Sequence, residues 1–165
     1  MRIDFTVILI FLWLSSSSAG MNNFLQKSDR SEYYSALNSS DIDLIKSQLK
    51  NLAERGSEDT TAYTGALKMK LAGLLNSPAE KLKTFKEGRK MLESAIAHDS
   101  ANVEYRFLRL VIQEHAPGIL NYKQNLEEDK NLIVKKFRTI GKFLAAELKR
   151  YSESSKILRP VDLNE

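Results

Sequence analysis

Apolar residues recur at intervals of three and four positions through most of the chain after residue 40, which is the spacing of one helical face. A serine or aspartate that can cap a helix precedes the first clear run, at Ser40 or Asp41, and Gly56 can end it. The apolar members of this run are Ile42, Ile45, Leu49 and Leu52. The pattern predicts a helix over residues 40–55.

The same spacing predicts further helices over residues 59–75, 77–98, 103–115, 121–137 and 139–151. The third of the six has a defined start, because Ser77 can cap it and Pro78 suits the first helical position. The last two share one apolar stripe, so they could form a single helix bent near Gly141. We prefer two helices with a break near Arg138 and Thr139.

The helix over residues 59–75 has a face of small residues, which favours close approach to a neighbouring helix. This face consists of Ala62, Gly65, Ala66, Met69, Ala72 and Gly73. Only 7 glycines and 3 prolines interrupt the chain, which favours helix over sheet. We therefore expect an all-α fold in which five to six antiparallel helices pack as helical hairpins, with no sheet.

The first 20 residues have the three regions of a secretory signal peptide. Arg2 supplies positive charge, Phe5–Leu14 is an apolar run too short to span a bilayer, and small residues follow over 15–20. We expect cleavage near Ala19 or Gly20 and export to a periplasm or the medium. Translation from Met21 is the alternative, and it would leave the protein in the cytoplasm.

The domain boundaries follow from composition. Residues 21–39 are mostly polar and are predicted to be a flexible lead-in, with a short apolar patch at its end. Residues 40–151 form the predicted helical domain. Residues 152–165 are polar, contain Pro160, and are predicted to be a disordered tail.

The chain is mildly basic, with a formal net charge of +4 in 165 residues, which disfavours a dedicated nucleic-acid-binding protein. Cysteine is absent, which excludes disulfides, cysteine-based zinc sites and a thiol nucleophile. We identify no metal set and no cofactor motif.

The segment Leu92–Phe107 (LESAIAHDSANVEYRF) resembles the junction between two tetratricopeptide repeats. Ala95 matches the small residue near the end of the second helix, and Asp99 and Asn102 match the turn, with Ser100 where proline is usual. Gly88 matches an earlier small position. The resemblance covers about one repeat and implies stacked antiparallel helix pairs with a protein-binding role, and no catalytic residues.

Arg106 and Arg109 are three positions apart beside an apolar face, so they could line a groove that binds a carboxylate or phosphate. The alternative, which we prefer, is that both pair with acidic neighbours across a helix interface. The acidic run Glu127–Asp129 is placed in the first turn of a helix, where negative charge opposes the positive end of the dipole. An enzyme that uses these carboxylates beside the arginines is a less favoured hypothesis.

Residues 130–150 are strongly basic. A solvated helix face is the preferred interpretation, and contact with an anionic surface, lipid or nucleic acid, is the alternative. The candidate contacts for that surface are Lys135, Lys136, Arg138 and Lys142.

Both histidines, His98 and His115, are predicted near helix ends, where they suit the negative end of the dipole. No catalytic constellation can be assembled from the sequence. We therefore expect a non-enzymatic adaptor that binds a protein or peptide, or that self-associates, through an apolar surface left uncovered at the end of a short repeat array. The residues expected there are Leu144, Leu148 and Tyr151.

Overall fold

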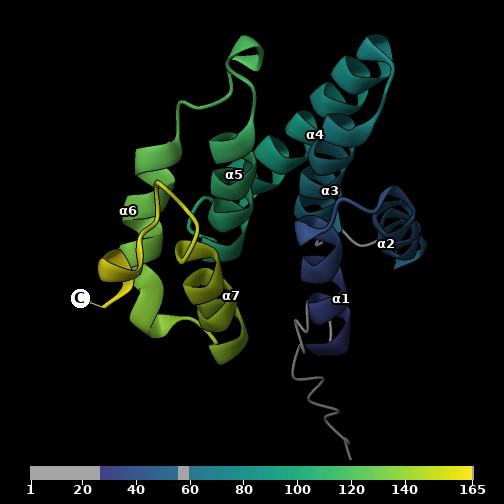
Figure 1. Cartoon of the computed structure of the whole chain (residues 1–165). Helices are drawn as coiled ribbons and strands as arrows, with labels where there is room; N and C mark the ends of the chain where they lie inside the picture. Colours follow the sequence, from purple (N-terminus) through teal and green to yellow (C-terminus); the bar gives the residue numbers. More distant parts are fainter. Residues whose placement is uncertain (1–26, 56–59, 165) are drawn as a thin grey trace, which may run out of the picture.

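The computed structural model describes residues 27–55 and 60–164, and all regular structure in these ranges is helical (Figure 1). The α-helices are α1 Lys27–Asn38, α2 Ile42–Arg55, α3 Thr61–Leu74, α4 Pro78–His98, α5 Val103–His115, α6 Leu126–Lys136 and α7 Lys142–Ser152. Short 3₁₀-helices are η2 Gly118–Leu120, η3 Phe137–Thr139 and η4 Pro160–Leu163. The all-α prediction is confirmed, although the described residues contain seven α-helices rather than five or six. The predicted signal peptide lies outside the described residues.

Polar side chains fix where three of the helices begin. Asp41 Oδ1 accepts hydrogen bonds from the backbone N–H groups of Asp43 and Leu44, at 2.9 and 3.1 Å, directly before α2. Ser77 Oγ accepts from the N–H of Glu80 before α4, and Asn102 caps α5. Each cap satisfies amide groups that have no partner within the helix, and each contributes about 1 kcal/mol.

Helices α3 and α4 form an antiparallel hairpin with an unusually close approach. A Cβ atom on Gly65 would lie 2.7 Å from the carbonyl oxygen of Gly88, and one on Gly88 would lie 2.5 Å from the carbonyl oxygen of Gly65. The backbones therefore touch where both residues are glycine. The small-residue face predicted for the helix over residues 59–75 is confirmed, except that Gly73 is exposed.

Helices α5 and α6 pair next to this hairpin, α2 packs against α3, and α1 contacts both α2 and α3 (Figure 1). Helix α7 follows α6 after η3, so the break predicted near Arg138 and Thr139 is confirmed. None of the helices in residues 27–55 and 60–164 is long and apolar enough to cross a membrane.

The prediction of a flexible lead-in is wrong for Lys27–Asn38, which forms α1. Tyr33, Tyr34 and Leu37 are buried in the core. The ring of Tyr33 packs edge-on against Tyr63 at 4.8 Å, and the Tyr34 hydroxyl donates to Glu104 Oε1 at 3.0 Å. Most other residues of α1 are polar, so this helix depends on these tertiary contacts for its stability.

The prediction of a disordered tail is also wrong for residues 152–164. Leu158 and Leu163 are buried, and η4 contacts α7. Glu114 holds the start of the tail, because its carboxylate accepts from Ser155 Oγ at 2.6 Å and from the Lys156 N–H at 2.7 Å. At the other end, Lys130 pairs with Asp162 at 3.1 Å. These bonds offset the entropy of ordering a polar segment.

The expectation of an uncovered apolar surface on the last helix is wrong as well. Leu144, Leu148 and Tyr151 are 6%, 0% and 8% exposed, so they belong to the core of the single chain. The Tyr151 ring packs edge-on against Phe107 of α5 at 5.4 Å. The apolar face of α7 is therefore buried by packing within the chain.

Candidate functional site

The two arginines singled out in the sequence lie side by side on α5 and face a buried carboxylate of α6. Arg109 donates to both oxygens of Asp129, from Nε to Oδ2 and from Nη2 to Oδ1, each at 2.7 Å. Arg106 Nη1 donates to Asp129 Oδ1 at 2.9 Å. Asp129 is fully buried and both arginines are nearly so. This is the interhelical pairing that the sequence favoured.

Further partners accept from other donors of both arginines. Arg106 Nε donates to the carbonyl oxygen of Ser100 at 2.9 Å, and Arg109 Nη1 donates to Glu93 of α4 at 2.9 Å. Burial by itself lowers the pKa of Arg109, but the hydrogen bonds and charge of Asp129 outweigh it and raise that pKa above its usual value. The charges of both arginines are therefore paired with acids of the chain itself.

The three acidic residues at the start of α6 point in different directions. Asp129 points inward to the arginines, Glu128 is exposed but reaches Arg106 at 2.6 Å, and Glu127 is exposed. The predicted place in the first turn of a helix is confirmed. The burial of Asp129 was not predicted. A signal for it exists, because Asp129 is four positions before Ile133 and therefore lies on the same helical face as this core residue.

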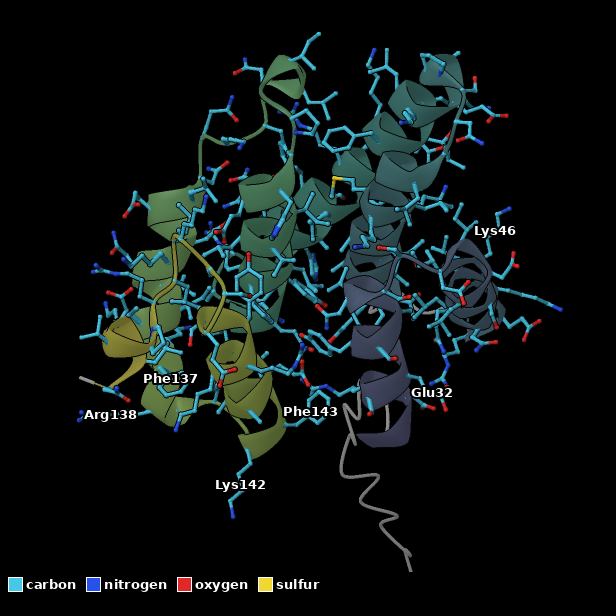
Figure 2. All side chains as sticks on the ribbon, viewed as in Figure 1. Glu32, Lys46, Phe137, Arg138, Lys142 and Phe143 are labelled. Atoms are coloured by element: carbon cyan, nitrogen blue, oxygen red, sulfur yellow. The ribbon has the colours of Figure 1, made fainter. Side chains whose placement is uncertain are left out.

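The basic residues after residue 130 are spread along α6, η3 and the start of α7. Lys135, Arg138 and Lys142 are exposed, and Figure 2 shows Arg138 and Lys142 at the lower end of the molecule. Lys136 Nζ instead donates to the carbonyl oxygen of Ala101 at 2.8 Å. Three of the four predicted surface contacts are therefore open to solvent, and Lys136 also ties α6 to the start of α5.

A cleft that the sequence did not reveal runs between α1 and α7. It consists of two adjoining hollows that share Asn38 and Arg150. The outer hollow, about 310 Å³, is lined by Ser31, Tyr34, Ser35, Asn38, Ser39, Glu147 and Arg150. The inner hollow, about 260 Å³, is lined by Leu37, Asn38, Lys70, Val111, Ile112, His115, Arg150, Tyr151 and Ser154. The cleft thus draws on α1, α3, α5 and α7.

The inner hollow combines apolar walls with cationic groups. Lys70 of α3 is half-buried, and no ion pair of its ammonium group is found within residues 27–55 and 60–164. Burial lowers the pKa of Lys70, because the charged form loses hydration there. Arg150 is paired with Glu147 one turn earlier on α7. The inner hollow is thus positively charged and has no acidic lining residue of its own.

His115 and Asn38 add directional polar groups to the cleft. The Nδ1 of His115 lies 2.9 Å from the carbonyl oxygen of Val111, so Nδ1 carries the proton and Nε2 is left for another partner. Asn38 Nδ2 donates to the carbonyl oxygen of Tyr34 at 2.6 Å, which leaves its Oδ1 as an acceptor. His98, at the end of α4, does not line the cleft.

Sequence reasoning placed His115 at a helix end, which is confirmed, but it gave no sign of the cleft. Lys70 and Asn38 look like ordinary surface residues of their own helices. They lie near His115 only because α1, α3 and α5 pack together. Patterns among neighbouring residues in the sequence do not predict such contacts between helices.

In the part of the chain that the structure describes, no three histidine or acidic side chains gather as a metal site would need. Comparisons of the chain with protein-family models, with curated proteins and with solved structures found no match. The resemblance of Leu92–Phe107 to a tetratricopeptide repeat is therefore not confirmed.

Proposed function

We propose that the protein is an exported helical adaptor that binds a peptide segment of a partner protein in the cleft between α1 and α7, with no chemistry of its own. The observation that carries this proposal is Lys70, which is half-buried in the partly apolar inner hollow and has no ion pair among the residues that the structure describes. A desolvated ammonium group gains more from an incoming carboxylate than a solvated one does. The tetratricopeptide-like junction supports the same class of function.

The lining favours a short stretch of acidic and apolar residues. Lys70 suits a carboxylate and Nε2 of His115 can accept from a peptide N–H or hydroxyl group, while Leu37, Val111 and Ile112 suit an aliphatic or aromatic side chain. The two hollows share Asn38 and Arg150 in their linings, and the Oδ1 of Asn38 can accept from a peptide N–H group. An extended segment would therefore fill both hollows at once.

A library of random peptides, screened on the protein comprising residues 21–165, tests the proposal. We expect the selected peptides to combine a carboxylate with a large apolar residue. Lys70→Gln should weaken their binding roughly ten- to hundredfold, since a hydrogen bond between charged groups contributes about 1.5–3 kcal/mol. Titration calorimetry with one selected peptide gives the affinities.

Lys68→Gln is the matched control, because Lys68 lies on the same helix but pairs with Glu87 of α4 at 2.9 Å, outside the cleft. This variant should bind the peptide as the wild type does. Ser35→Trp should block the outer hollow, while Ser47→Trp, at an exposed position of α2, should have no effect. The proposal fails if no peptide is selected, or if Lys70→Gln and Ser35→Trp leave binding unchanged.

A further inference from the structure

Two large apolar side chains are exposed near one end of the molecule. Most large apolar residues in the described ranges are buried or half-buried, but Leu82 of α4 is 45% exposed and Ile119 of η2 is 93% exposed. The third exception, Val161 of η4, lies on the C-terminal tail. Single exposed apolar residues are common on protein surfaces, but Leu82 and Ile119 belong to segments that contact each other.

Tyr122 joins the loop that carries Ile119 to the helix that carries Leu82. Its ring packs edge-on against Phe85 at 5.7 Å, and the Arg89 guanidinium lies 4.6 Å from its centre. Leu82, Phe85 and Arg89 occupy adjoining positions on α4. Figure 1 shows η2 and the connection between α3 and α4 projecting at the same end of the molecule.

The turn that presents Ile119 is braced rather than loose. The N–H groups of Leu120 and Asn121 donate to the carbonyl oxygens of Pro117 and Gly118, each at 3.0 Å. Asn121 has a φ of 45°, a left-handed conformation that asparagine tolerates. Gln124 Nε2 donates to the carbonyl oxygen of Asn121 at 2.7 Å. The fold therefore holds Ile119 in solvent instead of folding it onto the core.

Exposed lysines flank Leu82 on α4, and the acidic Glu87 between them is paired with Lys68 of α3. Lys86 and Lys90 follow Leu82 at intervals of four residues, so they share its helical face, and Lys83 flanks it. None of these three lysines has an ion pair among the residues that the structure describes. Two exposed apolar side chains with lysines beside them are complementary to an anionic lipid bilayer, in which apolar chains lie beneath phosphate groups.

We propose that this end of the molecule docks on an anionic lipid bilayer, with Ile119 and Leu82 entering the interface and Lys83, Lys86 and Lys90 contacting the headgroups. The opposite end carries Lys135, Arg138 and Lys142 (Figure 2), and among the described residues the exposed large apolar side chain that lies away from Leu82 and Ile119 is Val161 of η4. The aromatic residues of the opposite end, Phe137 and Phe143, are half-buried. This docking is separate from peptide binding in the cleft.

A tryptophan reporter tests the insertion step, because residues 21–165 contain no tryptophan of their own. The protein of residues 21–165 with Ile119→Trp is mixed with vesicles made of phosphatidylglycerol and phosphatidylcholine. We expect the fluorescence to shift to the blue as the indole enters the interface. Val161→Trp, at the other exposed apolar position outside this end, should show no shift. Failure of Ile119→Trp to shift, or an equal shift at both positions, would overturn the proposal.

Charge removal tests the orientation. The triple change Lys83→Gln, Lys86→Gln and Lys90→Gln should weaken binding to these vesicles about a hundredfold, since each lysine near the surface contributes about 1 kcal/mol. The matched triple change Lys135→Gln, Arg138→Gln and Lys142→Gln should leave it nearly unchanged. Circular dichroism checks that both variants fold. Loss of binding only in the second variant, or equal binding to pure phosphatidylcholine, would contradict the proposal.

Discussion

At the residue scale, the molecule depends on one fully buried carboxylate. Asp129 accepts hydrogen bonds from two arginines of α5, Arg106 and Arg109, which are only 7% and 4% exposed. A buried ion pair adds little compared with apolar packing, but removal of one partner leaves the other charge buried and uncompensated.

Asp129→Asn should therefore lower the free energy of unfolding by about 3–5 kcal/mol, because it leaves Arg106 and Arg109 facing an amide. Urea denaturation followed by circular dichroism measures this change. Glu127→Gln, two positions earlier and exposed, is the control and should cost less than about 1 kcal/mol. Equal stability of the two variants would show that the buried network is unimportant.

At the element scale, the α3–α4 hairpin is fixed by backbone contact rather than by side-chain interlocking. Gly65 and Gly88 face each other at a distance that no Cβ atom can enter. Gly73, on the same helix α3, has no neighbouring atom within 4 Å of the position of its Cβ. The two positions of α3 separate the effect of helix–helix contact from the effect of helix propensity.

Gly65→Ala should destabilise the protein by at least about 1–3 kcal/mol, because the new methyl group forces the two backbones apart. Gly73→Ala should instead stabilise it by about 0.4–1 kcal/mol, since alanine restricts the unfolded chain and favours helix. Thermal unfolding of the two variants beside the wild type measures both signs. A shift of the same sign for both would contradict the contact argument.

At the scale of the whole molecule, the C-terminal tail folds back and closes the arrangement of α5, α6 and α7 (Figure 1). Glu114 is the anchor, because its carboxylate accepts from Tyr151, Ser155 and Lys156. Burial by itself raises the pKa of Glu114, but these three hydrogen bonds outweigh it and the net pKa is lowered.

A carboxylate with a lowered folded-state pKa stabilises the fold above its unfolded pKa of about 4.3, and this stabilisation is lost as pH falls through the folded pKa. The tail should therefore loosen below about pH 4. Hydrogen-exchange protection of the Lys156 amide, measured by NMR and corrected for intrinsic rate, should fall over this range.

Glu114→Gln should lower the protection of the Lys156 amide roughly tenfold even at neutral pH. The glutamine side chain has one acceptor oxygen, whereas the glutamate carboxylate has two. Asp162 also holds the tail through Lys130 and has a lowered pKa, chiefly from the hydrogen bond of the Arg159 N–H, so some acid sensitivity should remain in this variant. A protection factor independent of both pH and the substitution would rule out the anchor.

Local sequence patterns are sufficient to predict the features that depend on residues close together in the chain. The starts of α2 and α4, the break after α6 and the small face of α3 all follow from spacings of one to four residues. Helical hydrogen bonds and caps join neighbours, so local patterns are sufficient to predict them.

Which side chains contact each other depends on how the helices pack. Helix α1 and the tail were predicted to be unstructured because their own composition is polar, and they are ordered by partners far away, such as Glu104 for Tyr34 at a separation of 70 positions. The inward turn of Asp129, the burial of Leu148 and the cleft at Lys70 depend likewise on how helices pack. The free energy that fixes these features comes from non-local burial and pairing, which periodicity along the chain does not record.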